Sequence, residues 1–288
     1  MSFHADSDLF SDVCYCDAWT IKLGSNSEKH AIAAIDIFAI IVSVLPLMYY
    51  MYSSWKSTCG WEEVYVCSIE LTKCFISLFR SYEAPGVLYL STGNTLYWLR
   101  YGEWLLTCPV ILIHLSNITG LKDAYSKRTM KLLVSDIGTI VFGVSSAAST
   151  GPLKIFFFVL GLIYGANTFF HAAKVYVESY HMVPRGTCKL LVRLMAMVYF
   201  VSWSMFPIFF VLGPEGFGVL SHLGSDIAHT WIDLMSKNLW GFIGHLLRQK
   251  IHYHILKHGD IRKTTKVNIA GEEVNVETYV EEEDEETV

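Results

Sequence analysis

Seven apolar stretches, each long enough to cross a lipid bilayer, limit what this chain can fold into more than any other feature of its sequence. A membrane-spanning helix needs about 20 mostly apolar residues, and glycines and prolines interrupt the chain between the stretches. The sequence therefore predicts an all-α membrane protein built as a bundle of seven transmembrane helices. The expected helices lie at residues 30–54, 61–82, 95–117, 126–147, 152–180, 187–212 and 218–249.

The amino-acid composition agrees with membrane residence. Hydrophobic residues make up 52% of the chain and charged residues 17%, against roughly 45–50% and 25% in soluble domains. These values exclude a disordered chain, a nucleic-acid binder with a basic surface and a disulfide-stapled miniprotein. The net charge of −5 arises at the end of the chain, because residues 271–288 hold nine acidic residues and no basic one.

The basic residues between the apolar stretches predict the orientation. Thirteen Lys and Arg residues fall on one side of the membrane and four on the other, which places the N-terminus outside and the C-terminus in the cytosol. No cleaved signal peptide is expected, since residues 1–20 lack an apolar core. We expect an extracellular segment at 1–29, the seven-helix domain at 30–250 and a cytosolic tail at 251–288. A hairpin around Ala270 and Gly271 is expected in that tail, with a solvated coil as the alternative.

Ionisable side chains inside a bilayer are costly and usually functional. In the second expected helix Glu63, Glu70, Lys73 and Ser77 share one face, which predicts a hydrated path. A structural ion pair between Glu70 and Lys73 is the alternative. The other helices with ionisable residues carry Arg100, Glu103, Thr107 and His114 on the third, Asp136 on the fourth, and Asp226, His229, Asp233 and Lys237 on the seventh.

Lys237 has the surroundings of a lysine that stays positively charged. A lone buried lysine loses its proton, whereas Asp233 four residues earlier and Glu103 on another helix supply carboxylates. A protonated Schiff base requires this arrangement. Aromatic and proline residues expected nearby would enclose a long conjugated aldehyde, and retinal fits: Trp104, Trp203, Phe206, Pro207 and Trp240.

At these residues the sequence resembles the channelrhodopsins, light-gated cation channels of green algae within the microbial rhodopsin family. The resemblance covers the chain from Cys14 to the tail, and its longest runs are 55–65 (WKSTCGWEEVY), 103–117 (EWLLTCPVILIHLSN), 164–173 (YGANTFFHAA), 213–218 (GPEGFG) and 233–238 (DLMSKN). It implies all-trans retinal bound covalently to Lys237, with Glu103 and Asp233 as counterions. It also implies a retinal pocket that includes Thr107, Cys108 and Ser236 besides the aromatic residues above.

The resemblance further implies a cation pathway along the first, second, third and seventh helices. It places a central gate at Ser43, Glu70 and Asn238, and a Cys108–Asp136 pair that times closing. The implied inner gate consists of Glu62, Glu63, His114 and Arg248. The chain departs from well-known relatives in the outer pore, where Ser77 and Ser81 stand in place of glutamates and the expected pore residues are Asp36, Lys73, Arg100 and Asp226.

The function expected from the sequence is a light-gated passive channel for H⁺, Na⁺ and other cations, not an enzyme. A light-driven proton pump, a light-gated anion channel and a seven-helix receptor for a diffusible ligand are the alternatives. A pump usually has a carboxylate about eleven residues after Glu103, where this chain has His114.

The expected partners are permeating cations, membrane lipid and a second copy of the chain, with no nucleic acid. Cys14 and Cys16 lie on the oxidising side and are too close in sequence to bridge each other. We therefore expect disulfides between two protomers, with two free thiols as the alternative. The resemblance implies the plasma membrane near an algal eyespot, and a longer cytosolic region after Val288.

Overall fold

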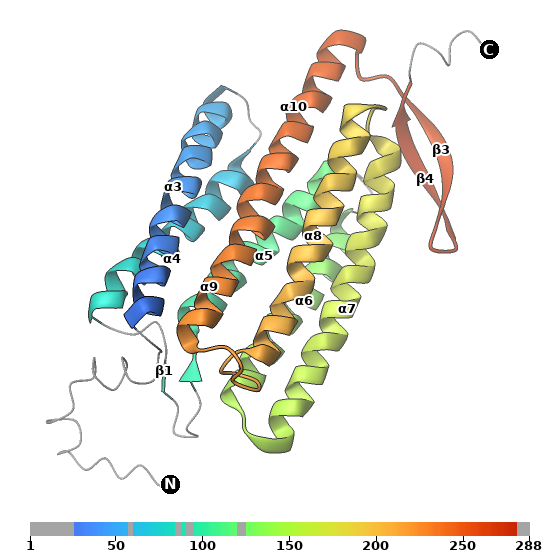
Figure 1. Cartoon of the computed structure of the whole chain (residues 1–288). Helices are drawn as coiled ribbons and strands as arrows, with labels where there is room; N and C mark the ends of the chain where they lie inside the picture. The colour runs from blue at the N-terminus through green and yellow to red at the C-terminus, as the bar shows by residue number, and fades with distance from the viewer. Residues whose placement is uncertain (1–25, 57–59, 84–87, 90–94, 120–124, 281–288) are drawn as a thin grey trace, which may run out of the picture.

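The computed structural model describes residues 26–56, 60–83, 88–89, 95–119 and 125–280. Its long helices form the expected seven-helix bundle (Figure 1). The seventh consists of three consecutive segments, which together continue beyond residue 250. The helices are α3 (Asn26–Lys56), α4 (Trp61–Glu83), α5 (Trp98–Thr119), α6 (Tyr125–Ala148), α7 (Gly151–Met182), α8 (Thr187–Leu212) and the run α9 (His222–Asp233), η1 (Leu234–Leu239) and α10 (Trp240–His258).

The seven helices differ in how apolar they are. Four of them, α3, α6, α7 and α8, are long and apolar enough to cross a membrane by length and composition alone. The remaining three carry most of the buried ionisable residues, and their buried carboxylates include Glu70, Glu103 and Asp233. Large apolar side chains such as Leu45, Phe156 and Met197 remain exposed on the bundle surface. Lipid accommodates such side chains, so the helices bury polar groups against one another and present apolar ones outward.

The seventh helix changes its winding at Lys237. In η1 the backbone adopts a π-helix, and the N–H of Trp240 bonds to the carbonyl of Met235, five residues earlier. A single turn of this kind inserts one extra residue and is frequent at functional sites. Here the inserted turn lies between Asp233 and Trp240, so it sets the directions of Lys237 and Asn238 relative to the neighbouring helices.

A two-stranded hairpin follows the last helix. Strand β3 (Arg262–Ile269) pairs antiparallel with β4 (Glu272–Tyr279), and Ile269 lies opposite Glu272. The two turn residues, Ala270 and Gly271, both have positive φ, as two-residue hairpin turns of this twist require. The hairpin packs beside α7 at one end of the bundle (Figure 1), where Lys174 Nζ is 3.1 Å from Glu272 Oε2. We call this end the hairpin end.

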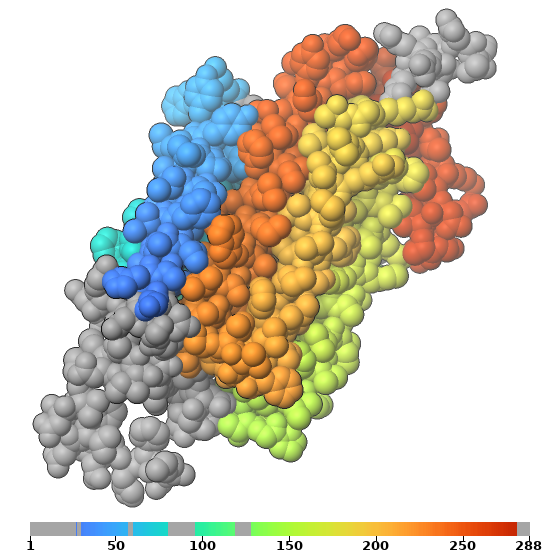
Figure 2. Space-filling model, viewed as in Figure 1, coloured from blue at the N-terminus to red at the C-terminus, as the bar shows by residue number. Residues whose placement is uncertain are grey.

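At the opposite end, a second pair of short strands joins α4 to α5. Strands β1 (Leu88–Tyr89) and β2 (Thr95–Leu96) are antiparallel. The space-filling view shows α3, α10 and α8 side by side along one face, with the hairpin beyond them (Figure 2). The largest apolar core cluster includes Leu112, Leu115, Met195 and Leu247. The polar residues are concentrated between α3, α4, α5 and the seventh helix instead.

Candidate functional site

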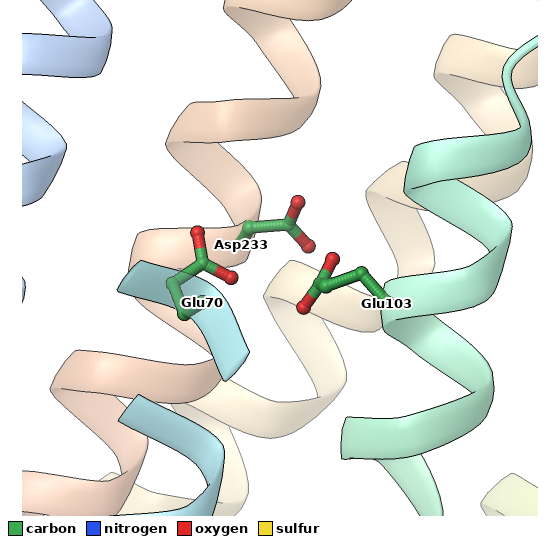
Figure 3. A group of neighbouring side chains, drawn as sticks. All are labelled: Glu70, Glu103 and Asp233. Carbon is green, nitrogen blue, oxygen red and sulfur yellow. The ribbon is translucent and has the colours of Figure 1, made fainter. Parts of the chain in front are cut away.

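Three carboxylates surround Lys237 in the middle of the bundle. Its Nζ lies 2.5 Å from Asp233 Oδ1 and 3.3 Å from Glu70 Oε2, and it also forms an ion pair with Glu103. Asp233 is one turn before Lys237, whereas Glu70 comes from α4 and Glu103 from α5. Figure 3 shows the three carboxylates pointing toward one another. Because all are buried, a positive charge between them is stabilised by ion pairs that water does not screen.

Lys73 belongs to the same cluster, although the sequence placed this residue in the pore. Its Nζ is 2.6 Å from Asp233 Oδ2, 3.8 Å from Glu70 Oε1 and 3.9 Å from Glu103 Oε2. The Glu70–Lys73 pair considered as an alternative is therefore present as one contact of a larger network. We call Glu70, Lys73, Glu103, Asp233 and Lys237 the central cluster.

Two further side chains orient the carboxylates of the central cluster. The indole Nε1 of Trp104 donates to Asp233 Oδ1 at 3.1 Å, and the hydroxyl of Thr107 donates to Glu103 Oε1 at 3.2 Å. From its position Trp104 was expected to line a pocket, and it does so while also making this polar contact. Two carboxylates of the central cluster, those of Asp233 and Glu103, are therefore held by fixed donors on α5.

The residues expected at a central gate are brought together only in part. Asn238 donates to the hydroxyl of Ser43 at 2.8 Å and accepts from the thiol of Cys67 at 3.4 Å. Glu70 instead contacts the two lysines of the central cluster. Its carboxylate lies one turn along α4 from Cys67, so the Ser43–Asn238 bond and the central cluster adjoin.

The residues expected at an inner gate form one network toward the hairpin end. Arg248 Nη1 lies 3.2 Å from Glu62 Oε2 and 3.4 Å from Glu63 Oε2, and His114 Nδ1 is 3.5 Å from Glu63 Oε1. His245 was not expected from the sequence, and its Nδ1 is 3.8 Å from the same Glu63 oxygen. The sequence clue that could have pointed to His245 is its position on the seventh helix, three residues before Arg248, because residues three apart share a helix face.

Two contacts toward the other end involve the expected pore residues. Ser77 donates to Asp36 Oδ2 at 2.7 Å, and Arg100 Nη2 is 2.5 Å from Asp226 Oδ1. Arg100 also lies 3.7 Å from Glu215, a buried residue of the α8–α9 loop that was not expected at the site. Burial raises the pKa of Glu215, and the nearby Arg100 opposes that rise. No periodic pattern marks a loop residue, so only its position in the GPEGFG run pointed to it.

A cavity of about 320 Å³ lies on the other side of α5 from the inner-gate network. Five of the expected pocket residues line it, namely Trp104, Cys108, Trp203, Phe206 and Pro207. Aromatic side chains and small residues of α6 and α7, such as Gly143 and Gly161, form much of the rest. Trp104 connects the cavity to the central cluster through its bond to Asp233. The apolar space suits a long conjugated polyene, and Lys237, which does not line the cavity in the described part of the chain, is the amine with which its aldehyde would react.

Three other expected pocket residues make different contacts. Thr107 bonds to Glu103, Ser236 Oγ donates to the backbone carbonyl of Asp233 at 3.3 Å, and Trp240 Nε1 donates to Tyr176 at 2.7 Å. None of the three is among the residues that line the cavity in the described part of the chain.

Cys108 and Asp136 both line the cavity, from α5 and α6 respectively. Asp136 is buried, and its Oδ2 has no hydrogen-bond partner among the described residues. The Cys108 thiol is free and buried. The two residues face a shared space, and a direct hydrogen bond between them is not among the contacts of the described chain. Cys14 and Cys16, and the side chain of Ser81, lie outside the described residues.

Comparisons with known proteins agree with this geometry. Residues 30–251 match the family model of bacteriorhodopsin-like proteins. A crystal structure of the red light-activated channelrhodopsin Chrimson is similar over 93% of both chains, with 48% sequence identity and a TM-score of 0.86.

More distant relatives share the architecture. Bacterial rhodopsin CSR3 of Haloarcula vallismortis is 24% identical over 79% of this chain and 93% of its own. Sensory rhodopsin-2 of the same organism is 27% identical over 53% of this chain and 64% of its own. The crystal structure of the proton-pumping rhodopsin AR2 from Acetabularia acetabulum is 16% identical, covers 81% of this chain and 99% of that one, and has a TM-score of 0.64, which establishes the fold alone.

Proposed function

This chain belongs to the bacteriorhodopsin-like family, in its channelrhodopsin branch, and from that premise we propose that it is a light-gated passive cation channel. Chrimson, the similar protein at 48% identity, is a channelrhodopsin activated by red light. The curated relatives named above are a bacterial rhodopsin and a sensory rhodopsin at lower identity. Passive conduction of cations such as H⁺ and Na⁺ is the function that the side chains of this chain support best.

The observation that carries the proposal is a row of buried and partly buried polar contacts along the length of the bundle. It runs from Arg100–Asp226 and Asp36–Ser77 through the central cluster to Ser43–Asn238 and the Arg248–Glu62–Glu63 network. Acidic groups recur at every level except Ser43–Asn238, which favours cations over anions. These contacts join α3, α4, α5 and the seventh helix, so separating those helices opens a path that carboxylates line.

Retinal bound to Lys237 as a protonated Schiff base supplies light absorption and a light-driven change of shape. We propose the all-trans form in the dark. Asp233 and Glu103 then hold the positive charge at the lysine nitrogen, and Trp104 and Thr107 fix the directions of those two carboxylates. The apolar cavity excludes water from the polyene. Cys108 and Asp136 face the same cavity from α5 and α6, a position from which they can time closing.

The remaining alternatives differ from the proposal in how they handle charge. A proton pump accepts and reloads a proton at the lysine, and His114 occupies the position on α5 where many pumps carry a reloading carboxylate. Light-evoked current under symmetric salt and pH tests the proposal. A passive channel gives a current that reverses near zero voltage, whereas a current that keeps one direction through that voltage contradicts it.

Assembly and location follow as parts of the same proposal. We propose that two protomers associate, with disulfides through Cys14 and Cys16, and that the protein lies in the plasma membrane at an algal eyespot. The exposed apolar side chains of α3, including Leu45, Met48 and Trp55, suit contact with lipid or with a second protomer. The transport role requires no enzymatic step.

A further inference from the structure

Two basic side chains lie against the ring of Tyr180 at the hairpin end of the bundle. Tyr180 is near the end of α7, and Lys189 and Arg193 are one turn apart near the start of α8, the helix beside it (Figure 1). Cζ of Arg193 is 4.8 Å from the centre of the ring, and Nζ of Lys189 is 5.1 Å from it. One aromatic ring therefore holds two positive charges close together.

No carboxylate among the described residues neutralises this pair of charges. Arg193 Nη2 donates to the hydroxyl of Tyr180 at 2.5 Å, which uses one of the five N–H donors of a guanidinium. Neither Arg193 nor Lys189 forms an ion pair within the described part of the chain. Glu178, two residues before Tyr180, is buried and pairs with Arg128 of α6 instead. Because like charges four residues apart repel each other, the pair favours an anion between them.

Arg193 interrupts an apolar stripe on the outside of α8. Leu190, Met197 and Val201 are each about half exposed, and with Arg193 they follow one another at steps of three and four residues, which places all four on one helix face. We call the three apolar residues the α8 stripe. Exposed apolar side chains of a membrane protein face lipid, and a charge among them is costly unless it meets a polar partner.

The depth of Arg193 suits the phosphate groups of a bilayer. It is six residues after the first residue of α8, which is about 9 Å along the helix axis. The 26 residues of α8 span about 39 Å, more than the roughly 30 Å of the hydrocarbon layer, so the helix ends extend toward the headgroups. An arginine side chain at this depth reaches the headgroups while its stem stays among the lipid tails.

We propose that Tyr180, Lys189 and Arg193 bind the phosphate group of an anionic phospholipid, whose tails lie along the α8 stripe. Arg193 supplies paired donors for two phosphate oxygens, Lys189 adds a second positive charge, and the ring of Tyr180 keeps both in place. The α8 stripe favours a lipid over a free phosphate ion, because a free ion makes no contact with it. The orientation expected from the basic residues places this lipid in the cytosolic leaflet, and its binding does not depend on whether the protein conducts ions.

Lipid binding to the purified, retinal-loaded protein tests the site. Native mass spectrometry during a titration in detergent counts the bound molecules of dioleoyl-phosphatidylglycerol, which is anionic, and of dioleoyl-phosphatidylcholine, which is neutral and has the same tails. The wild type is expected to prefer phosphatidylglycerol. Arg193→Gln and Lys189→Gln should each weaken its binding about fivefold, since one basic residue near the membrane surface contributes about 1 kcal/mol. The double variant should bind one phosphatidylglycerol molecule fewer than the wild type.

Two control variants separate this site from a general attraction to positive charge. Arg193→Lys keeps the charge and should keep most of the preference for phosphatidylglycerol. Lys56→Gln removes a single lysine at the end of α3, whose Nζ is 4.5 Å from the centre of the Tyr52 ring, and it should bind phosphatidylglycerol as the wild type does. Visible absorbance equal to that of the wild type shows that each variant is folded.

Three results would overturn the proposal. The first is equal binding of the two lipids by the wild type, and the second is an equal loss of phosphatidylglycerol in Lys56→Gln and Lys189→Gln. The third comes from calorimetric titration of inorganic phosphate into the same protein, which is expected to show no saturable binding. Saturable phosphate binding that disappears in Arg193→Gln would identify a site for a free anion rather than for a lipid.

Discussion

The two sides of α5 differ in every respect that matters for function. Toward α3, α4 and the seventh helix, which we call the polar side, carboxylates form ion pairs with lysines and arginines at several levels along the bundle. Toward α6, α7 and α8, which we call the apolar side, lies a cavity of about 320 Å³ lined mainly by aromatic and small residues. Under the proposed function, ions pass along the polar side and the light-absorbing group lies on the apolar side.

The two sides meet at α5 and at Lys237. Trp104 lines the cavity and donates to Asp233, and Glu103, one residue earlier, forms an ion pair with Lys237. We propose that a change of shape in the cavity moves the helix that carries one wall of the polar path. Substitutions on each side should change different measured properties, which the following predictions use.

The largest effect is expected where the two sides meet. Lys237→Arg keeps the charge but cannot form a Schiff base, so visible absorbance and light-evoked current should both be lost completely. Lys73→Arg is the matched control, because Lys73 contacts the same carboxylates. Absorption spectra of the two purified variants decide the point. Visible absorbance in Lys237→Arg would show that retinal is attached elsewhere.

On the apolar side, closing should slow strongly. Cys108→Ser and Asp136→Asn are each expected to prolong the open state at least about tenfold, near 1.4 kcal/mol in the barrier, without loss of retinal binding. The physical reason is that both face the cavity, where we propose that α5 moves against α6 when the channel opens and closes. The decay of current after a light pulse measures the effect.

Two further variants sharpen that result. Cys188→Ser alters another buried free thiol, away from the cavity, and should close at the wild-type rate. A double Cys108→Ser, Asp136→Asn variant should show less than the sum of the single effects, because coupled residues are not additive. Wild-type closing in Cys108→Ser would remove Cys108 from the mechanism.

On the polar side, selectivity should change more than colour. Glu70→Gln removes a charge of the central cluster that adjoins the Ser43–Asn238 bond, so relative cation permeabilities should shift. The absorption maximum should shift less, because Glu70 is the farthest of the three carboxylates from Lys237 Nζ. Glu178→Gln is the matched control, since that buried carboxylate pairs with Arg128 between α6 and α7. A large spectral shift with unchanged selectivity would place Glu70 in the retinal pocket.

The smallest functional effect is expected for Cys14 and Cys16, which belong to neither the polar nor the apolar side of α5. Serine at positions 14 and 16 should abolish a dimer band on non-reducing gels and leave absorbance, closing rate and selectivity at wild-type values. Helix packing can hold two protomers without disulfides, so the band reports the covalent link alone. An exclusively monomeric band from unreduced wild-type protein would contradict the link.

The length of the apolar stretches and the glycines and prolines between them were sufficient to predict the seven helices, because a bilayer permits few other arrangements for such stretches. The spacing of Asp233 and Lys237 likewise predicted their contact, since residues four apart share a helix face. Lys73 shows the limit of this reasoning. Its reach to Asp233 crosses from α4 to the seventh helix, and a helical period carries no information about which partner a long side chain meets.

Three other features also depend on tertiary structure. The π-helical turn at Lys237 has no local sequence signal, since its residues are compatible with an ordinary α-helix. Glu215 contacts Arg100 from a loop, where no period exists. His245 joins Glu63 only once α4 and α10 are placed together. For Glu215 and His245 the partner lies far away in sequence.

The most direct test of the division between the two sides is the reversal potential of the light-evoked current when one ion is exchanged at a time. If carboxylates on the polar side line the open path, a tenfold change in the permeant monovalent cation should move the reversal potential by up to about 59 mV, and replacing chloride should leave it unchanged. A reversal potential that follows chloride and ignores the cation would contradict the account.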